Sequence, residues 1–373
     1  MVEYLSGGRI QGSSTAQGGQ NIPKTAWKEI ARVKLSSAGD NINTGTGAGG
    51  DVITNTMYAT PKEHMMLIFH TEGVGGAANG IDNVMYQFGN NTLDSSYNYA
   101  TRTSTDGTDA TTDSGDSMTG LRIRSGGATA QDFFNVSSIE NKSGFDKMLL
   151  GKTCYGTTTN NCHHAFSNGK WTNTALLNRI NVNQSGSNAD FGQNSELIVL
   201  GCDSNEADNG TAFWECLGDK TLTSATDTIE MTITPKKYLW IQSALFIDGA
   251  QNPRLQFNGD ATNSNYGMIT ETDYGGFSGG TQDGIPVGGG INVDPDNAFD
   301  NIYMTNISGQ AKFFVQNRVI DEGTGAGNEP HAVTVAGRWY NSSDTGQITS
   351  LKLYNKSSGT WKAGSSFCVW GAD

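Results

Sequence analysis

Residues 234–249 read TPKKYLWIQSALFIDG, and residues 60–73 read TPKEHMMLIFHTEG. Both stretches have a Thr-Pro-Lys entry, an apolar run, and an acidic residue next to a Gly at the exit. Such a run, bounded by Pro and Gly, is typical of a buried β-strand. The two stretches start 174 residues apart, at Thr60 and Thr234. The repetition predicts a duplicated structural module, with His64, His70 and two Met making the first copy the looser variant.

Further matches follow in the same order along both copies, and an internal repeat of this kind predicts two copies of one supersecondary plan. The matching pairs are Trp27 with Trp214, residues 86–88 with 255–257, Tyr97 with Tyr266, Trp171 with Trp339, and residues 198–203 with 368–373.

Composition predicts an all-β chain. The sequence has 49 Gly, only 16% charged residues, and 7 Trp, 12 Tyr and 15 Phe, which favours turns and aromatic-rich strands over helices. Short apolar or alternating segments separated by Gly, Asn and Asp turns predict antiparallel sandwiches. We therefore expect two tandem jelly-roll-like antiparallel β-sandwiches, related by internal duplication.

The expected boundaries follow from local composition. Residues 1–26 are rich in Gly and Ser and predict an extended arm. The first sandwich is expected at 27–203, a short polar linker at 204–212, and the second sandwich at 213–373. A Gly-rich stretch at 43–50 predicts an insertion in the first copy. The copies differ most at 100–120, 153–170 and 271–300, which we interpret as loops that would carry any specificity.

The net charge is −13, from 24 Lys and Arg against 37 Asp and Glu. An evenly acidic surface repels nucleic acid and anionic membranes, so we expect neither as a partner. The first ten residues lack a cationic segment followed by an apolar one, and no run is long enough to span a bilayer. The sequence predicts a protein made in the cytoplasm without a signal peptide.

Cysteine and histidine cluster at Cys154, Cys162, His163 and His164. A zinc site, a local Cys154–Cys162 disulfide and an ordinary loop all remain open, because the spacing matches none of the usual zinc patterns. The redox states of Cys202 and Cys216 are equally open. Cys368 lies in an apolar segment and is expected to be a buried thiol.

Two acidic segments have the hard oxygen ligands that calcium prefers, on backbone that we expect to be mobile. Both lack the EF-hand register, so solvated turns are the alternative reading. Calcium is the ion that these acidic residues favour, and no organic cofactor is expected. The residues are Asp106, Asp109, Asp113 and Asp116 in the first copy, and Asp294, Asp296 and Asp300 in the second.

Aromatic residues near predicted turns are candidates for stacking on sugars: Tyr97, Tyr99, Tyr266 and Tyr274. Trp171 and Trp339 recur in both copies and favour core packing instead. At Tyr97 and Tyr266, packing and binding both remain open. The chain contains no phosphate loop or dinucleotide fingerprint, and no acid in an apolar context suited to glycan hydrolysis. We therefore expect a non-enzymatic protein.

Several segments of the second copy carry a resemblance to a known group: residues 255–260 (LQFNGD), 264–266 (SNY), 323–330 (GTGAGNEP), 337–339 (GRW) and 342–351. They resemble modules of uncharacterised structural proteins of marine phages and related viruses. The first copy matches only partly, since the Cys/His segment replaces Gly-Ala-Gly-Asn. The resemblance implies a virion component: a coat or capsid protein, a decoration or a fibre.

The function expected from the sequence is therefore self-assembly within a virus particle, as a trimer or a larger homo-oligomer in contact with other virion proteins. Assembly would proceed through the sandwich walls and the N-terminal arm. The alternative is a lectin-like adhesin or receptor-binding protein that recognises cell-surface glycans through its variable loops at 86–116 and 255–300.

Overall fold

The computed structural model describes residues 27–38, 41–43, 61–71, 84–88, 97–105, 109–118, 120–124, 132–158, 161–184, 191–203, 212–249, 252–272, 276–287, 297–320 and 331–373. The expected arm at 1–26, linker residues 204–211, and the Gly-rich stretch after Asn43 lie outside these ranges. We call the described residues between 27 and 203 the first module, and those between 212 and 373 the second module.

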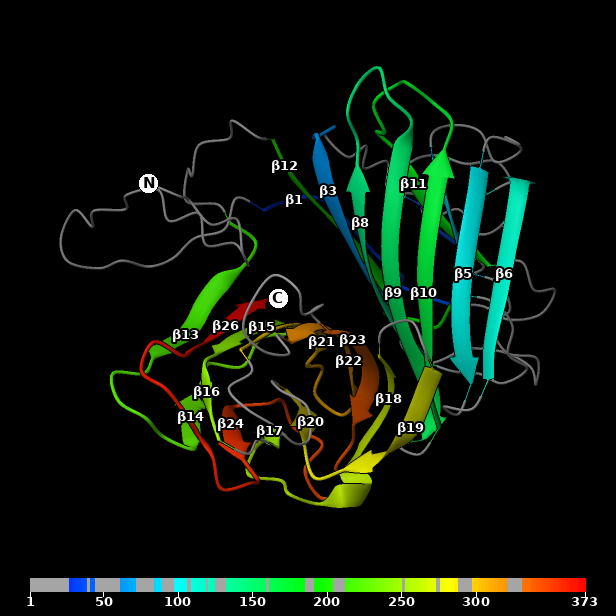
Figure 1. Ribbon diagram of the computed structural model, residues 1–373. Coiled ribbons are helices and arrows are strands. Elements are labelled where there is room, and N and C mark those ends of the chain that lie inside the picture. The colour runs from blue at the N-terminus through cyan, green and yellow to red at the C-terminus, as the bar shows by residue number, and fades with distance from the viewer. Residues whose placement is uncertain are drawn as a thin grey trace.

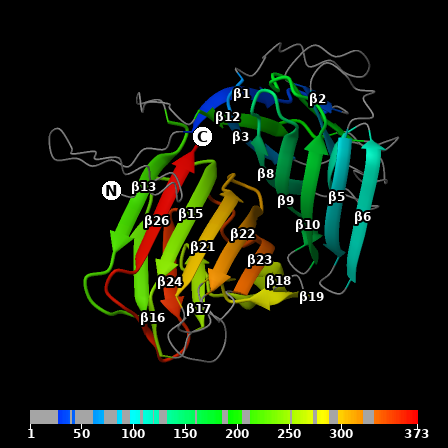
Figure 2. The same ribbon diagram turned by 45° about the horizontal axis from the view of Figure 1, so that its top comes forward.

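Each module contains one large and one small antiparallel sheet (Figures 1 and 2), which confirms the all-β prediction. In the first module the large sheet has the order β1 (Lys28–Lys34), β12 (Glu196–Cys202), β3 (His64–His70), β8 (Asp132–Glu140), β9 (Lys147–Thr158), β10 (Asn161–Trp171), β5 (Tyr97–Thr105), β6 (Asp109–Met118). The small sheet has the order β2 (Asn41–Asn43), β11 (Ile180–Gln184), β4 (Val84–Phe88), β7 (Leu121–Arg124).

The second module has sheets of the same sizes. Its large sheet has the order β13 (Glu215–Thr221), β26 (Ser366–Ala372), β15 (Tyr238–Leu245), β21 (Ala298–Thr305), β22 (Lys312–Ile320), β23 (His331–Trp339), β18 (Tyr266–Thr272), β19 (Gly276–Gln282). The small sheet has the order β14 (Thr228–Thr232), β24 (Ser350–Asn355), β17 (Pro253–Phe257), β20 (Ile285–Pro286). A pair formed by β16 (Ile247–Asp248) and β25 (Thr360–Trp361) and the short helix η1 (Asn263–Asn265) complete it.

Each module has its own core between the large and the small sheet. In the first module, Leu67 on β3 packs in the same buried cluster as Tyr86 on β4 and Val182 on β11. In the second module, Ile241 on β15 shares a cluster with Leu255 on β17. Side chains that alternate toward this space fill it from both sheets, as in any two-layer sandwich.

A third apolar cluster, which we call the inter-module core, lies between the two large sheets. The first module contributes Met66, Ile68, Phe134, Val136, Cys154, Ile198 and Leu200. The second contributes Trp214, Tyr238, Trp240, Tyr303, Ala311, Phe313, Val315, Ala336, Cys368, Trp370 and Ala372. The molecule is therefore built from four layers of sheet, in the order small, large, large, small.

This arrangement explains why the repeated strands are apolar at nearly every position. On β15, Leu239 points into the core of the second module, whereas Tyr238 and Trp240 point into the inter-module core. On β3, Leu67 and Met66 divide in the same way. A strand covered on both faces reads as a continuous apolar run. Burying each large apolar side chain contributes about 1.5–3 kcal/mol.

Two segments expected to be loops are strands. Strand β9 extends to Thr158 and β10 starts at Asn161, so the Cys/His segment is a hairpin in the large sheet. Likewise β5 and β6 fill most of 97–118. These strands are rich in Thr, Ser, Asn and Gly and lack clear apolar alternation, so the sequence pattern does not reveal them.

Candidate functional site

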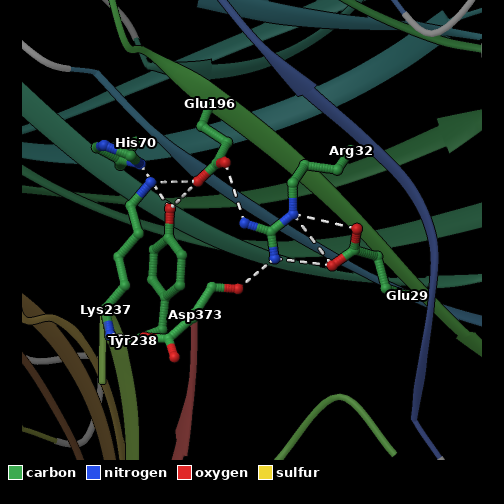
Figure 3. Close-up of polar contacts among 7 residues, drawn as sticks. All are labelled: Glu29, Arg32, His70, Glu196, Lys237, Tyr238 and Asp373. Atoms are coloured by element: carbon green, nitrogen blue, oxygen red, sulfur yellow. Dashed lines mark hydrogen bonds and ion pairs between the residues drawn. The ribbon is translucent and has the colours of Figure 1, made fainter. Parts of the chain in front are cut away.

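The polar contacts between the modules gather around the carboxylate of Glu196 on β12 (Figure 3). Its Oε1 accepts a hydrogen bond from Arg32 Nη1 at 3.0 Å. Its Oε2 accepts hydrogen bonds from Lys237 Nζ at 2.6 Å and from Tyr238 Oη at 2.7 Å, both in the second module. The Glu196 side chain is only 3% exposed. One buried carboxylate thus connects the two modules.

Three more residues complete this group, which we call the Glu196 cluster: Glu29, Arg32, His70, Glu196, Lys237, Tyr238 and Asp373. His70 Nδ1 lies 2.8 Å from Tyr238 Oη. Arg32 Nη2 donates to Glu29 Oε2 at 2.7 Å and to the main-chain carbonyl of Asp373 at 2.5 Å. Asp373 is thereby held against β1 of the first module.

The environment of Glu196 strongly favours its charged form. Burial by itself raises the pKa of the carboxyl group, but the charge of Lys237, the hydrogen bonds from Lys237 and Tyr238, and the charge of Arg32 outweigh it and lower the pKa to about 2. Hydrogen bonds and cations at this distance stabilise a carboxylate more than desolvation penalises it. Glu196 is therefore ionised at every physiological pH.

A second row of polar contacts crosses the interface further along the sheets. Arg102 on β5 forms an ion pair with Glu271 on β18, and Lys152 Nζ on β9 bonds to Asn317 Oδ1 on β22. Burial lowers the pKa of Lys152 to about 7, although the charge of Glu271 acts in the opposite direction. These contacts fix how the two large sheets are aligned with each other and how far apart they lie.

The predicted Cys/His cluster lies in this interface. Cys154 Sγ donates to the carbonyl of Gly337 at 3.1 Å, and Cys162 Sγ donates to the carbonyl of Gly267 at 3.3 Å, so these two residues are thiols and form no disulfide. His163 points to the other face, where its ring stacks on Tyr155. Within the part of the chain that the structure describes, no three His, Cys, Asp or Glu residues form a group that could hold a metal ion.

His164 belongs to the same face as Cys154, its cross-strand partner. It is completely buried, and its ring lies edge-on to Phe277 of the second module. Burial, together with the charges of Lys152 and Arg102, lowers the pKa of His164 to about 3. The ring is therefore neutral and acts as a packing element between the modules.

The second module contains an open cavity of about 440 Å³ on the side of its large sheet that faces the small sheet. Its polar lining includes three basic side chains: Arg254, Arg318 and His331. Hydroxyl and amide groups come from Asn252, Thr270, Thr272, Ser278 and Gln282, and Met268, Ile320 and Val333 supply apolar surface. This mixture of convergent polar groups and apolar walls is typical of small-molecule sites.

Each arginine of this cavity is held by a carboxylate. Arg318 Nε donates to Asp300 Oδ1 at 2.8 Å, and Arg254 Nε lies 3.4 Å from Asp283 Oδ1. Arg254 also donates to Gln282 Oε1 at 3.3 Å. Asp300 is completely enclosed, and Ser243 donates to its other oxygen at 3.1 Å. The cavity is therefore pre-organised, with its cations fixed before any ligand enters.

The sequence left packing and binding open for Tyr97 and Tyr266 and made Tyr99 a candidate for sugar binding, and the structure places all three in cores. Tyr97 Oη accepts from Phe88 N at 2.6 Å, and Tyr266 Oη accepts from Phe257 N at 3.0 Å, each completely buried. Tyr99 is 6% exposed. Rings enclosed in this way cannot stack on a sugar at the surface. Tyr274 lies outside the described residues.

Four of the seven predicted calcium ligands belong to strands of the described structure. Asp109, Asp113 and Asp116 belong to strand β6, so the expectation of a mobile loop is wrong from Asp109 onward. Asp300 is buried and bonded to Ser243, Gln316 and Arg318 in the interior, so the solvated-turn reading is wrong for this residue. Asp106, Asp294 and Asp296 lie outside the described residues.

Three residues that organise the interface and the cavity, Glu196, Arg254 and Arg318, carry no distinctive signal in the sequence. Glu196 ends a loop and starts an apolar segment, and only the isolated charge beside Leu197–Leu200 hints at burial. Arg254 stands between Pro253 and Leu255, and Arg318 stands between Asn317 and Val319, as charged residues on a solvent-facing side of a strand would. Their roles depend on partners that are 18 or more residues away in the chain.

Among the described residues, no helix has the length and apolar character needed to cross a bilayer. Comparison with protein-family models and with curated proteins found no match for this chain.

Proposed function

We propose that this chain is a non-enzymatic structural protein that self-assembles, as a coat, decoration or fibre component of a virus particle. One observation carries the proposal: the two large sheets are joined over an aromatic-rich inter-module core, which makes two sandwiches into a single four-layer building block. The Glu196 cluster and the Arg102–Glu271 pair fix their mutual orientation. A building block of a regular assembly needs this rigidity, because every unit must present its surfaces at the same angle.

We infer further that each module is a jelly roll. In the first module the order β1-β12-β3-β8 in one sheet faces β2-β11-β4-β7 in the other. The chain crosses between the sheets repeatedly, as the strands of a jelly roll do. The hairpins β5–β6 and β9–β10 then extend the large sheet. The second module has the same order throughout, with β18–β19 and β22–β23 as the extending hairpins.

Internal duplication is supported by contacts that recur at matching positions. The lysine of each Thr-Pro-Lys entry pairs with the Asp that ends the last strand, and a buried lysine in each module closes the turn before its own strand. The pairs are Lys62–Asp203 and Lys236–Asp373, then Lys147 with the carbonyls of Lys142 and Phe145, and Lys312 with those of Ile307 and Gln310. The same contacts at matching positions support the origin of the two modules by duplication of one ancestral module.

Sedimentation velocity on the purified full chain tests the proposed function. We expect species heavier than the 39.7 kDa single chain, in a proportion that grows with protein concentration. The net charge of −13 opposes association, so raising the salt concentration should shift the distribution to larger species by screening. A single 39.7 kDa species at every concentration and salt level would contradict the proposal.

The cavity supports a second candidate function, recognition of an acidic sugar. Arg254, Arg318 and His331 offer cationic or hydrogen-bonding groups to a carboxylate, and the three hydroxyl side chains offer partners to sugar hydroxyls. None of the described residues that line the cavity is Phe, Tyr or Trp. Recognition would therefore rely on hydrogen bonds and charge, not on stacking.

An Arg254→Gln variant tests this candidate on an array of acidic and neutral glycans. Loss of one guanidinium from the cavity is expected to weaken binding of acidic glycans at least about tenfold, since a charge-assisted hydrogen bond contributes about 1.5–3 kcal/mol. Lys352→Gln is the matched control, because it removes one exposed cation from the same module. Equal binding by both variants would argue against the cavity as the site.

A further inference from the structure

The outer face of strand β9 is only half covered by the second module. Met148, Leu150, Lys152 and Cys154 alternate along this face, opposite to Leu149 in the core of the first module. Lys152 and Cys154 contact the second module through Asn317 and Gly337. Met148 and Leu150, in contrast, are 55% and 59% exposed. An apolar strip therefore continues beyond the interface into solvent.

The outer face of β22 in the second module shows the reverse pattern. Phe313 and Val315 lie in the inter-module core, and Asn317 contacts Lys152. Val319 is 49% exposed, and its cross-strand partner Phe299 on β21 is 38% exposed. On β22 the covered residues, Phe313 and Val315, lie at the start of the strand. On β9 the covered residues, Lys152 and Cys154, come after the exposed ones.

The ladders relate the two strips residue by residue. Lys147 and Lys312 are each paired with the tryptophan that ends the adjoining strand, Trp171 and Trp339. Counting from these lysines, Met148 corresponds to Phe313, Leu150 to Val315, and Cys154 to Val319. The cross-strand partner of Cys154 is Phe134, which likewise corresponds to Phe299.

The contact within the chain is therefore formed from two different ends of an equivalent surface. The first module contributes the end with Phe134 and Cys154, and the second contributes the end with Phe313 and Val315. Each module leaves its other end open. In the first module the open end is Met148 and Leu150, which correspond to the residues that the second module buries, Phe313 and Val315. In the second module the open end is Phe299 and Val319, which correspond to the residues that the first module buries, Phe134 and Cys154.

We infer that these two open ends bind each other between copies of this chain, with Met148 and Leu150 of one copy packing on Phe299 and Val319 of the next. The binding partner is a second copy of this chain, because every copy carries both open ends. These ends are apolar, and they correspond to the two surfaces that already bind each other once within the chain. Such a contact is head-to-tail, and its repetition gives a ring if the rotation closes and a filament if it does not. The inference rests on the proposed self-assembly and specifies its contact.

Two single variants and their mixture test the arrangement. Leu150→Glu blocks only the open end of the first module, and Val319→Glu blocks only that of the second. Both positions are exposed, so folding should be retained, which circular dichroism and thermal melting check. Ser224→Glu, in an exposed turn, controls for the added charge. The molar mass of each sample is measured by light scattering after size exclusion.

Head-to-tail binding predicts that each variant alone is a 39.7 kDa monomer, that an equal mixture forms a dimer of twice this mass, and that the control assembles like the unmodified chain. In the mixture, one intact end of each kind is available, which allows a single contact. The dissociation constant for self-association of each single variant should rise more than about tenfold, because a carboxylate is desolvated in the contact.

Other outcomes separate this inference from the proposed function. If Val319→Glu alone still associates through its intact first-module end, that end binds itself and the head-to-tail contact is wrong, while self-assembly stands. If both variants assemble like the control, assembly uses another surface and the inference is again wrong. If the unmodified chain is monomeric at all concentrations, both the inference and the proposed function are wrong.

Discussion

Replacing Trp240 by alanine is expected to destabilise the packing of the two modules by about 3–5 kcal/mol, the usual range for removing a large aromatic side chain from a core. Trp240 is 3% exposed and stacks on Tyr303 with ring centroids 5.2 Å apart. Trp214 lies edge-on to it at 5.6 Å. Trp240 Nε1 donates to Asn301 Oδ1 at 2.5 Å. The substitution removes the central ring of this aromatic group, and Asn301 Oδ1 loses one hydrogen-bond donor.

The loss should be local to the inter-module core, because Trp240 does not belong to the core of either sandwich. Differential scanning calorimetry is expected to give a lower first transition, and hydrogen exchange should become faster on β15 and β21 before the small sheets are affected. Trp240→Phe is the control, since it keeps a ring in the stack and is expected to cost much less. An unchanged first transition in Trp240→Ala would show that the modules are not held together by this core.

Changing Glu196 to glutamine is expected to destabilise the protein near neutral pH and to remove most of the acid sensitivity of the module contact. The carboxyl has a pKa of about 2 in the folded protein, against an ordinary value of 4.5. Because the folded value is the lower one, the unfolded chain binds more protons between these limits. The stabilisation is therefore complete above about pH 4.5 and is lost as the pH falls toward 2, and it amounts to about 3 kcal/mol.

Urea unfolding at a series of pH values between 2 and 7 measures this effect. The unmodified protein should lose stability steeply below about pH 4.5, and Glu196→Gln should show a flatter profile from a lower starting value. Glu29→Gln is the matched control, since Glu29 also bonds to Arg32 but is 35% exposed and is expected to cost under about 1 kcal/mol. Parallel pH profiles for the unmodified protein and Glu196→Gln would contradict this role.

The strands that carry the fold could be predicted because their apolar runs leave little alternative. The segments containing Leu67 and Ile241 are covered on both faces, which a continuous apolar run indicates by itself. The sequence could not show what covers the second face. The sequence predicts a looser first copy because of His70, yet this side chain is buried and its Nδ1 lies beside Tyr238 Oη on the corresponding strand of the other module.

Most of the candidate site could not be predicted from the sequence, for two physical reasons. Hairpins such as β5–β6 and β9–β10 are held in a sheet by neighbours and not by their own propensity, so their polar residues read as loops. Charged residues such as Glu196 and Arg318 acquire their roles from partners brought together only by folding. Lys62 and Lys236, by contrast, belong to the repeated Thr-Pro-Lys segments that the sequence shows, and each of these lysines pairs with an Asp in its own module.

Electron microscopy of the purified full chain at high concentration tests the central claim most directly. We predict regular particles, rings or filaments in which the repeating unit is the four-layer, two-module body with a fixed angle between its modules. A field of isolated 39.7 kDa molecules, or of molecules whose two modules adopt many relative orientations, would contradict the account of this chain as a rigid unit of assembly.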